Sequence, residues 1–156
     1  MGTPSGAPAR FAAWVEEAAR VSGVPSRLLA AVVSVESAWE AGAMSTAGAM
    51  GLMQLMPGTA RNLGVDPWDP RSNLVGGARY LAALLGRFGD LGFGLAAYNA
   101  GPARVLAAVR DGQRLPEETL RYVPHVLERM AALAPRLTST GAAAWGARPG
   151  DAASPR

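Results

Sequence analysis

The sequence predicts a single, mainly α-helical domain with little or no β-sheet. Apolar residues recur at helical spacing over most of the chain, and no alternating run is long enough to indicate a strand. The 156 residues suffice for one domain with a hydrophobic core but not for two of typical size. With 49% hydrophobic and 17% charged residues, the composition is that of a globular protein rather than a disordered one.

Apolar periodicity and helix-ending residues define the expected helices. In chain order they span residues 11–22, 26–36, 57–63, 72–88, 93–99, 102–110 and 116–134. Gly23 and Gly64 are expected to end the first and third helices, and Ser26 is a candidate N-cap of the second. Pro124 should kink or divide the last helix. Residues 40–56 form an irregular stretch rich in Gly, Met and Ala, in which we expect one short helix.

These helices place the domain over residues 9–136. Residues 1–8 are rich in Pro, Gly and Ser and are expected to form a flexible lead, and the Ala-, Gly- and Pro-rich residues 137–156 a flexible tail. Residues 1–8 lack the basic and apolar regions of a signal peptide. No apolar run approaches the roughly 18 residues of a membrane span, so we expect no stable membrane insertion. Either a signal was removed from this chain or export uses another route.

Missing residue types exclude several kinds of site. The absence of cysteine excludes disulfides, thiolate metal sites and a thiol nucleophile. His125 is the only histidine, which excludes a histidine metal cluster, and we expect neither a metal nor another cofactor. All fifteen basic residues are arginine, and the net charge of +3 is spread along the chain without the basic run typical of nucleic-acid binding. A nucleic-acid partner is not expected, whereas a polyanionic substrate would suit this charge.

Glu36 lies where an apolar helix face predicts a core residue. Leu28, Val32 and Glu36 are four residues apart on one stripe. A carboxyl group at such a position is partly desolvated, and its pKa rises toward the range of a general acid. The run of small residues that follows would suit the wall of a glycan cleft. The alternative is that the helix ends earlier and Glu36 is solvated.

Four motifs follow one another in the chain, and a fifth group of residues lies between them. They are Glu36-Ser37-Ala38-Trp39 with Ser45, Gly48 to Pro57, Ala97 to Pro102, Glu118 to Val123, and Asn73-Leu74 with Gly77 and Tyr80-Leu81. In order and spacing they resemble the catalytic domain of soluble lytic transglycosylases, from about Phe11 to Leu133. The resemblance implies a lysozyme-like fold, a mainly α member of that α+β superfamily, with a cleft.

The resemblance also implies the chemistry. In that family the glutamate of the Glu-Ser pair is the only catalytic carboxylate. Glu36 would protonate the bond between N-acetylmuramic acid and N-acetylglucosamine, then act as a base toward the muramyl C6 hydroxyl, which closes a 1,6-anhydro ring. An ordinary glycosidase needs two carboxyl groups, about 5 to 9.5 Å apart. Here the substrate's hydroxyl and N-acetyl groups would replace the second.

The substrate-binding residues that the resemblance implies are Ser45, Gly51, Met53, Gln54, Tyr98, Asn99 and Tyr122. Five of them have a structural alternative: Ser45 as a turn residue, Gly51 and Met53 as packing residues, and Tyr98 and Tyr122 as core residues. Trp39 and Trp68 are expected in packing or at the cleft rim. Glu40 is the rival carboxylate and is expected to be solvated. The family often has Asn-Pro where this chain has Glu40-Ala41, a departure that affects the loop rather than the identity of the acid.

The function predicted from the sequence is that of a monomeric lytic transglycosylase in the periplasm or cell envelope. Its partners would be peptidoglycan glycan strands, and an envelope-spanning secretion or conjugation machinery is a further candidate. Two alternatives stay open. One is a goose-type muramidase, which uses water, and the other is a glycan-binding scaffold of a secretion apparatus without turnover.

Overall fold

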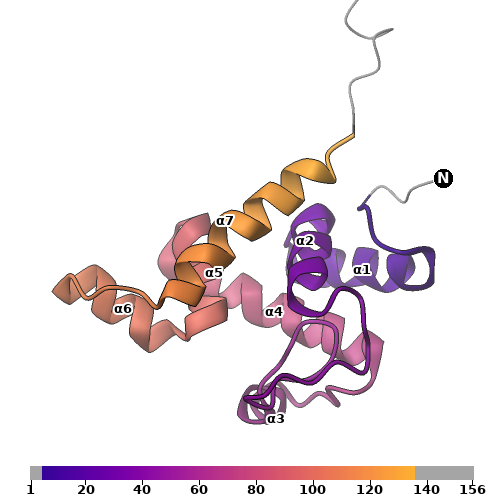
Figure 1. Cartoon of the computed structure of the whole chain (residues 1–156). Coiled ribbons are helices and arrows are strands. Elements are labelled where there is room, and N and C mark those ends of the chain that lie inside the picture. Colours follow the sequence, from indigo (N-terminus) through magenta and orange to yellow (C-terminus); the bar gives the residue numbers. More distant parts are fainter. Residues whose placement is uncertain (1–4, 136–156) are drawn as a thin grey trace, which may run out of the picture.

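The computed structural model describes residues 5–135, which form seven α-helices (Figure 1). The helices are α1 (Ala9–Ser22), α2 (Ser26–Ser37), α3 (Pro57–Leu63), α4 (Pro70–Phe88), α5 (Leu91–Ala100), α6 (Pro102–Asp111) and α7 (Glu117–Ala132). Between residues 5 and 135 there is no strand, only isolated antiparallel bridges of Met50 with Met44 and with Leu55. The predicted mainly helical fold class, with little or no β-sheet, is confirmed.

Helix α2 carries the centre of the hydrophobic core. It packs between α1 and α7, and α4 lies against both α1 and α5 (Figure 1). The side chains of residues 28–33 in α2 are almost completely buried, because helices cover this segment on more than one side. Helix α6 extends away from this core and is connected to it mainly through α5.

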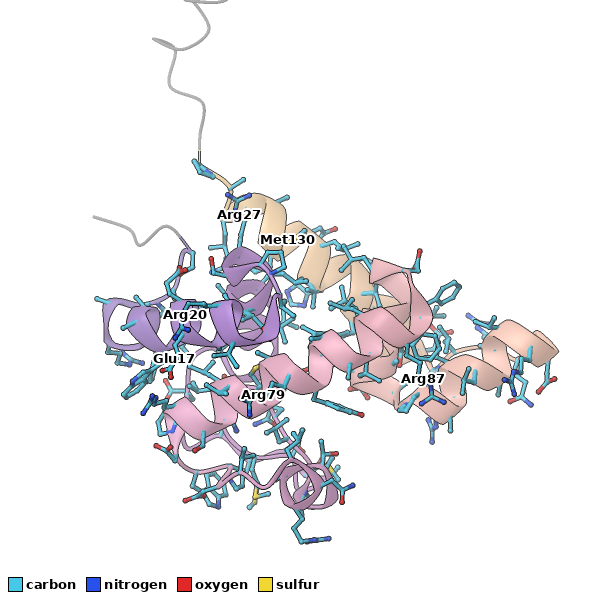
Figure 2. All side chains as sticks on the ribbon, turned by 180° about the vertical axis from the view of Figure 1, so that it is seen from behind. Glu17, Arg20, Arg27, Arg79, Arg87 and Met130 are labelled. Atoms are coloured by element: carbon cyan, nitrogen blue, oxygen red, sulfur yellow. The ribbon has the colours of Figure 1, made fainter. Side chains whose placement is uncertain are left out.

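The opposite view shows how the outer helices are tied together. Glu17 of α1 lies near α4 in Figure 2, and its carboxylate accepts two hydrogen bonds from Arg71 at 2.6 and 2.8 Å. Arg27, near the start of α2, lies beside Met130 of α7 in the same view, and both side chains line one shallow surface cavity. The start of α2 therefore lies close to the end of α7.

Most helix ends follow the local sequence rules. Gly23 and Gly64 adopt the left-handed conformation after α1 and α3, as predicted. Asp69 and Asp90 cap α4 and α5 by accepting hydrogen bonds from main-chain N–H groups. The prediction for Ser26 is wrong: Pro25 precedes the helix, Ser26 is its first residue, and no side chain caps this end.

Three further expectations are corrected. Residues 40–56 contain turns and bridges but no helix. Pro124 does not divide α7, whereas the expected kink stays a prediction. Because Pro124 lies on the exposed side of the helix, water can bind the carbonyl that lacks an N–H partner. The expected flexible lead is packed from Ser5 onward, with Ser5 and Ala7 buried. The rest of that lead, residues 1–4, and the expected tail, residues 137–156, lie outside the described residues.

No single helix within residues 5–135 is long and apolar enough to cross a membrane; α1 and α2 meet the length and composition criteria only as a pair, which is bent by 120°.

Candidate active site

Glu36 lies in the last turn of α2, at the end of the buried stripe that contains Leu28 and Val32. Its side chain is half-buried, and desolvation raises the pKa of its carboxyl group to about 7. The Tyr122 hydroxyl opposes this effect, and the negative charge of Glu118 adds to it. At neutral pH the carboxyl group is thus partly protonated, as a general acid requires.

The chain turns sharply directly after Glu36. Ala38 and Trp39 both have positive φ, at 50° and 66°, a conformation that costs non-glycine residues energy. Packing holds this turn in place, since the Trp39 ring stacks on Phe11 with centroids 5.9 Å apart and an interplanar angle of 15°. Arg10 Nη2 also donates to the Trp39 carbonyl at 3.3 Å. The expected packing role of Trp39 agrees with this position.

Ser37 links Glu36 to the loop that follows. Its buried hydroxyl group contacts the Val33 carbonyl at 3.2 Å and the Leu52 carbonyl at 2.8 Å. Leu52 belongs to a tight turn in which Met50 and Leu55 exchange two main-chain hydrogen bonds of 2.9 and 3.0 Å. The end of α2 and this turn are therefore held at a fixed separation.

Two predicted substrate-binding side chains hold this loop together. Ser45 Oγ accepts a hydrogen bond from the Ala49 N–H at 3.0 Å, the geometry of a turn residue. Gln54 has a φ of 51°, and its Nε2 donates to the carbonyls of Ala43 at 3.1 Å and Gly51 at 2.9 Å. The amide protons of Gln54 are therefore used within the loop, and its Oε1 is the group left to accept from a ligand.

Two other predicted residues face the interior. The Met53 side chain is fully buried against Gly77, where a Cβ atom would lie 2.5 Å from the Met53 sulfur. This burial agrees with the packing alternative for Met53, and its contact with substrate stays a prediction. Gly51 is also buried, with a φ of 77°, and a Cβ there would overlap Asn73 and lie 2.5 Å from the Pro67 carbonyl oxygen. Its missing side chain permits this close packing inside the protein.

The two predicted tyrosines differ in their hydrogen bonds. Tyr98 of α5 donates its hydroxyl proton to the Met53 carbonyl at 2.7 Å, and therefore not to Glu36. Tyr122 of α7 has a buried hydroxyl that forms no hydrogen bond of ordinary geometry, although it lies close enough to lower the pKa of Glu36. Burial, and then the Glu36 charge, raise the pKa of both phenols well above the ordinary value, so both stay protonated.

A cavity of about 240 Å³ adjoins Tyr98, and its lining also includes Gln54, Thr59, Tyr80 and Asn99. Asn99 Oδ1 accepts a hydrogen bond of 2.8 Å from Thr119 Oγ1. The orientation that this bond sets leaves the Asn99 amide protons for a ligand carbonyl. Thr59 and Thr119 were not expected at the site. Thr119 lies within a recognised motif, but only the fold shows that its hydroxyl meets Asn99.

Other candidates lie elsewhere or take different roles. Glu40 is exposed, as expected, and Trp68 is 44% exposed. Glu118 was noted only as part of a motif, yet its charge acts on the Glu36 carboxyl. Among residues 5–135, no three His, Asp or Glu side chains come together in a way that could hold a metal ion.

Comparison with known proteins relates this arrangement to a family. The profile of the transglycosylase SLT domain matches residues 13–120. A transglycosylase of Enterobacteria phage PRD1 is 50% identical over 76 residues, covering 48% of this chain and 29% of the phage protein. Membrane-bound lytic murein transglycosylase F 1 of Alkalilimnicola ehrlichii is 40% identical over 117 residues, covering 70% of this chain and 23% of that protein.

Solved structures agree. The lytic transglycosylase Slt of Pseudomonas aeruginosa, solved as an inactive Glu-to-Gln mutant, matches with a TM-score of 0.71 and 30% identity over 87% of this chain and 27% of its own. This chain spans less than a third of the length of each of these three proteins. Because the family profile covers more than half of the chain and a solved relative shares the fold, the chain belongs to the transglycosylase SLT domain family.

Proposed function

We propose that this chain cleaves the β-1,4 bond between N-acetylmuramic acid and N-acetylglucosamine in peptidoglycan without water, releasing 1,6-anhydro products. The observation that carries the proposal is the Glu36 carboxyl group, half-buried at the end of an apolar helix with a pKa of about 7. It is electrostatically coupled to Tyr98, which lines the adjoining cavity.

In the proposed reaction Glu36 acts twice. The protonated carboxyl gives its proton to the glycosidic oxygen as the bond to the muramyl C1 breaks, and N-acetylglucosamine leaves with a free hydroxyl. The resulting carboxylate then takes the proton of the muramyl C6 hydroxyl as O6 bonds to C1. Water is neither consumed nor released, and Glu36 ends protonated again. A pKa near 7 suits both steps, because neither the acid nor the base form is then strongly disfavoured.

The surrounding groups have supporting roles in this proposal. Tyr122 is the phenol whose proton is not donated elsewhere, so it stabilises the Glu36 carboxylate between the two steps. Gln54 Oε1 and the Asn99 amide protons bind sugar hydroxyl and N-acetyl groups at the cavity. Ser45 and Gly51 act on substrate through the loop that they shape.

Known relatives support the proposal. The relative from Alkalilimnicola ehrlichii is named a lytic murein transglycosylase, and the Pseudomonas aeruginosa Slt is inactive as a Glu-to-Gln mutant. We also propose that this chain acts on peptidoglycan in the cell envelope, and its monomeric state stays a prediction from the sequence. A role beside an envelope-spanning secretion or conjugation machinery stays a prediction from the sequence.

Digestion of purified peptidoglycan tests the proposal directly. Mass spectrometry should find fragments lighter by one water molecule than those of a hydrolase, and the Glu36→Gln variant should release none. Fragments with ordinary reducing ends from the unaltered protein would identify a muramidase. Binding without any released fragment would identify a scaffold.

One observation favours hydrolysis as a second candidate. Glu118 is a carboxylate close enough to affect Glu36, and a hydrolase needs such a group to activate water. Digestion in ¹⁸O-labelled water distinguishes the two, since only hydrolysis places the label in the product. The Glu118→Gln variant should keep its lytic activity if the anhydro mechanism operates.

A further inference from the structure

Asn73 of α4 is completely buried, and its side-chain amide binds three main-chain groups. Oδ1 accepts from the Met53 N–H at 2.8 Å, while Nδ2 donates to the carbonyls of Met50 at 3.0 Å and Pro67 at 2.9 Å. Both amide protons and the carbonyl oxygen thus have partners, which makes this orientation of the side chain the satisfied one. A single buried side chain thereby joins α4 to two separate loops.

The absence of a side chain at Gly51 leaves room for the Asn73 amide. A Cβ atom at residue 51 would overlap Asn73 Nδ2, and a φ of 77° already disfavours any residue with a side chain there. Gly51 lies between Met50 and Met53, the residues that Asn73 binds. The amide of Asn73 therefore fits closely into the concave side of this tight turn.

The segment held by Asn73 is hydrogen-bonded both to Ser37, the residue after Glu36, and to Tyr98. The Leu52 carbonyl accepts the Ser37 hydroxyl proton at 2.8 Å, and Ser37 follows Glu36 directly. The Met53 carbonyl accepts the Tyr98 hydroxyl proton at 2.7 Å. One short segment is thus connected to the general acid on one side and to the cavity-lining phenol on the other.

We propose that Asn73 is a positioning residue for the reaction, because it holds segment 50–53 where that segment can fix Glu36 and Tyr98 relative to each other. It touches neither group and acts through Ser37 and the two carbonyls. An apolar side chain of similar size would fill the same volume, but it would leave the Met53 N–H and the Pro67 carbonyl without partners, and the Met50 carbonyl with only its bond from the Leu55 N–H. The inference rests on the proposed lytic function, in which the relative placement of acid and substrate determines the rate.

Asn73→Asp is the most direct test. It preserves shape and an acceptor for the Met53 N–H, but presents an oxygen instead of an N–H donor to the carbonyls of Met50 and Pro67. Val15→Ala is the control, since it removes buried volume from α1 without removing a hydrogen bond. Melting temperature, kcat, KM and the alkaline limb of the pH profile are measured for both variants and the unaltered protein, below all melting temperatures.

For Asn73→Asp we expect kcat to fall about 10- to 100-fold, with a smaller change in KM, because misplacement of the reacting groups acts on the chemical step. The alkaline limb should also move, because water contact lowers the pKa of Glu36 and the charge of an ionised aspartate at residue 73 raises it. Val15→Ala should lower the melting temperature and leave kcat and the pH limb in place. Equal kcat values and pH limbs in the two variants would overturn the inference.

Two further measurements keep the outcome decisive. If Asn73→Asp does not fold, Ser37→Ala cuts the connection between Leu52 and α2, and an unchanged kcat and pH limb would then overturn the inference. If the unaltered protein releases no anhydro product, the proposed function fails separately. The linkage is then measured by NMR titration of the Glu36 carboxyl group in the Asn73 or Ser37 variant, where an unchanged pKa would overturn it.

Discussion

At the scale of single residues, the burial of the Glu36 carboxyl group has two effects. It keeps the group partly protonated for acid catalysis, and it lowers the stability of the fold where the group is ionised. Replacement by Gln preserves size and hydrogen bonding but removes the transferable proton. Loss of a general acid typically lowers rates by about 10²- to 10⁴-fold, so Glu36→Gln should lose turnover by at least that factor while keeping the helical circular dichroism spectrum. Turnover close to that of the unaltered protein would remove Glu36 from the mechanism.

The pH dependence of activity and stability follows from the same group. The folded-state pKa of Glu36 is about 7 against an ordinary value of 4.5, so the folded protein binds more protons between these values. Stability contributed by this residue therefore falls as the pH rises through this window. The full loss is up to about 3 kcal/mol before the solvent screening of a half-buried group reduces it.

Glu36→Gln should accordingly be more stable than the unaltered protein at pH 8 and equally stable near pH 4, by thermal melting. The turnover of the unaltered protein should decline as the pH rises above about 7, since the first step needs the protonated acid. Parallel stability curves for the two proteins from pH 4 to 8 would show that Glu36 is not desolvated.

At the scale of elements, α5 and α7 each contribute one tyrosine, and the two should respond differently to loss of the hydroxyl. Tyr98→Phe leaves the buried Met53 carbonyl without its donor, which costs about 1–3 kcal/mol of stability in addition to any loss of turnover. The Tyr122 hydroxyl forms no hydrogen bond in the structure, so Tyr122→Phe breaks none. Turnover should therefore fall with little change in melting temperature. A Tyr122→Phe variant with full specific activity would make Tyr122 a core residue only.

A hydrogen bond between α5 and α7 sets the orientation of the Asn99 side-chain amide. Thr119 is buried, and its hydroxyl donates to Asn99 Oδ1. Thr119→Val keeps the shape and loses this bond, whereas Thr119→Ser keeps it. If Asn99 binds the glycan, the Val variant should raise KM by about 2- to 10-fold, the value of one hydrogen bond, and the Ser variant should not. Equal KM values in the two variants would show that the amide orientation has no part in binding.

The helices were predictable from the sequence because their evidence is local. Periodic apolar residues identified the buried stripe of α2 and thus the environment of Glu36, and glycine ended α1 and α3 as expected. The loop between α2 and α3 was not predictable in this way. Its path depends on the left-handed conformation of Gln54, which hydrogen bonds to Ala43 and Gly51 support. These hydrogen bonds depend on the three-dimensional path of the loop, so a local sequence pattern does not predict them.

At the scale of the whole molecule, the same distinction explains the site residues. Family motifs identified the residues that surround Glu36, but not which of their atoms are already occupied. Met53 and Gly51 face inward, and Ser45 and Gln54 use their side chains within the loop. Asn73 was noted by its motif alone, because a polar residue in an amphipathic helix gives no sign of burial. Its hydrogen bonds in the folded protein show that Asn73, in α4, holds the loop beside the site.

The N-terminal residues provide a test of how far the folded unit extends. Ser5 and Ala7 are buried before α1 begins, and Gly6 has a φ of 78° close to Leu133, just after α7. This segment therefore joins the start of the described chain to its end. A variant beginning at Ala9 should be less stable than one beginning at Ser5 by about 1–2 kcal/mol, or several degrees in melting temperature.

Gly6→Ala in the full chain is the matched variant for this segment. Its Cβ would lie 2.6 Å from a Leu133 methyl carbon and would be strained by the positive φ, so it should lower the melting temperature in the same direction. Gly112→Ala is the control: Gly112 also has a positive φ, of 65°, but a Cβ there would meet nothing within 4 Å. The difference between the two glycine variants then measures the contact with Leu133 rather than the backbone conformation. Equal melting temperatures for the chains beginning at Ser5 and at Ala9 would place the boundary of the folded unit at α1.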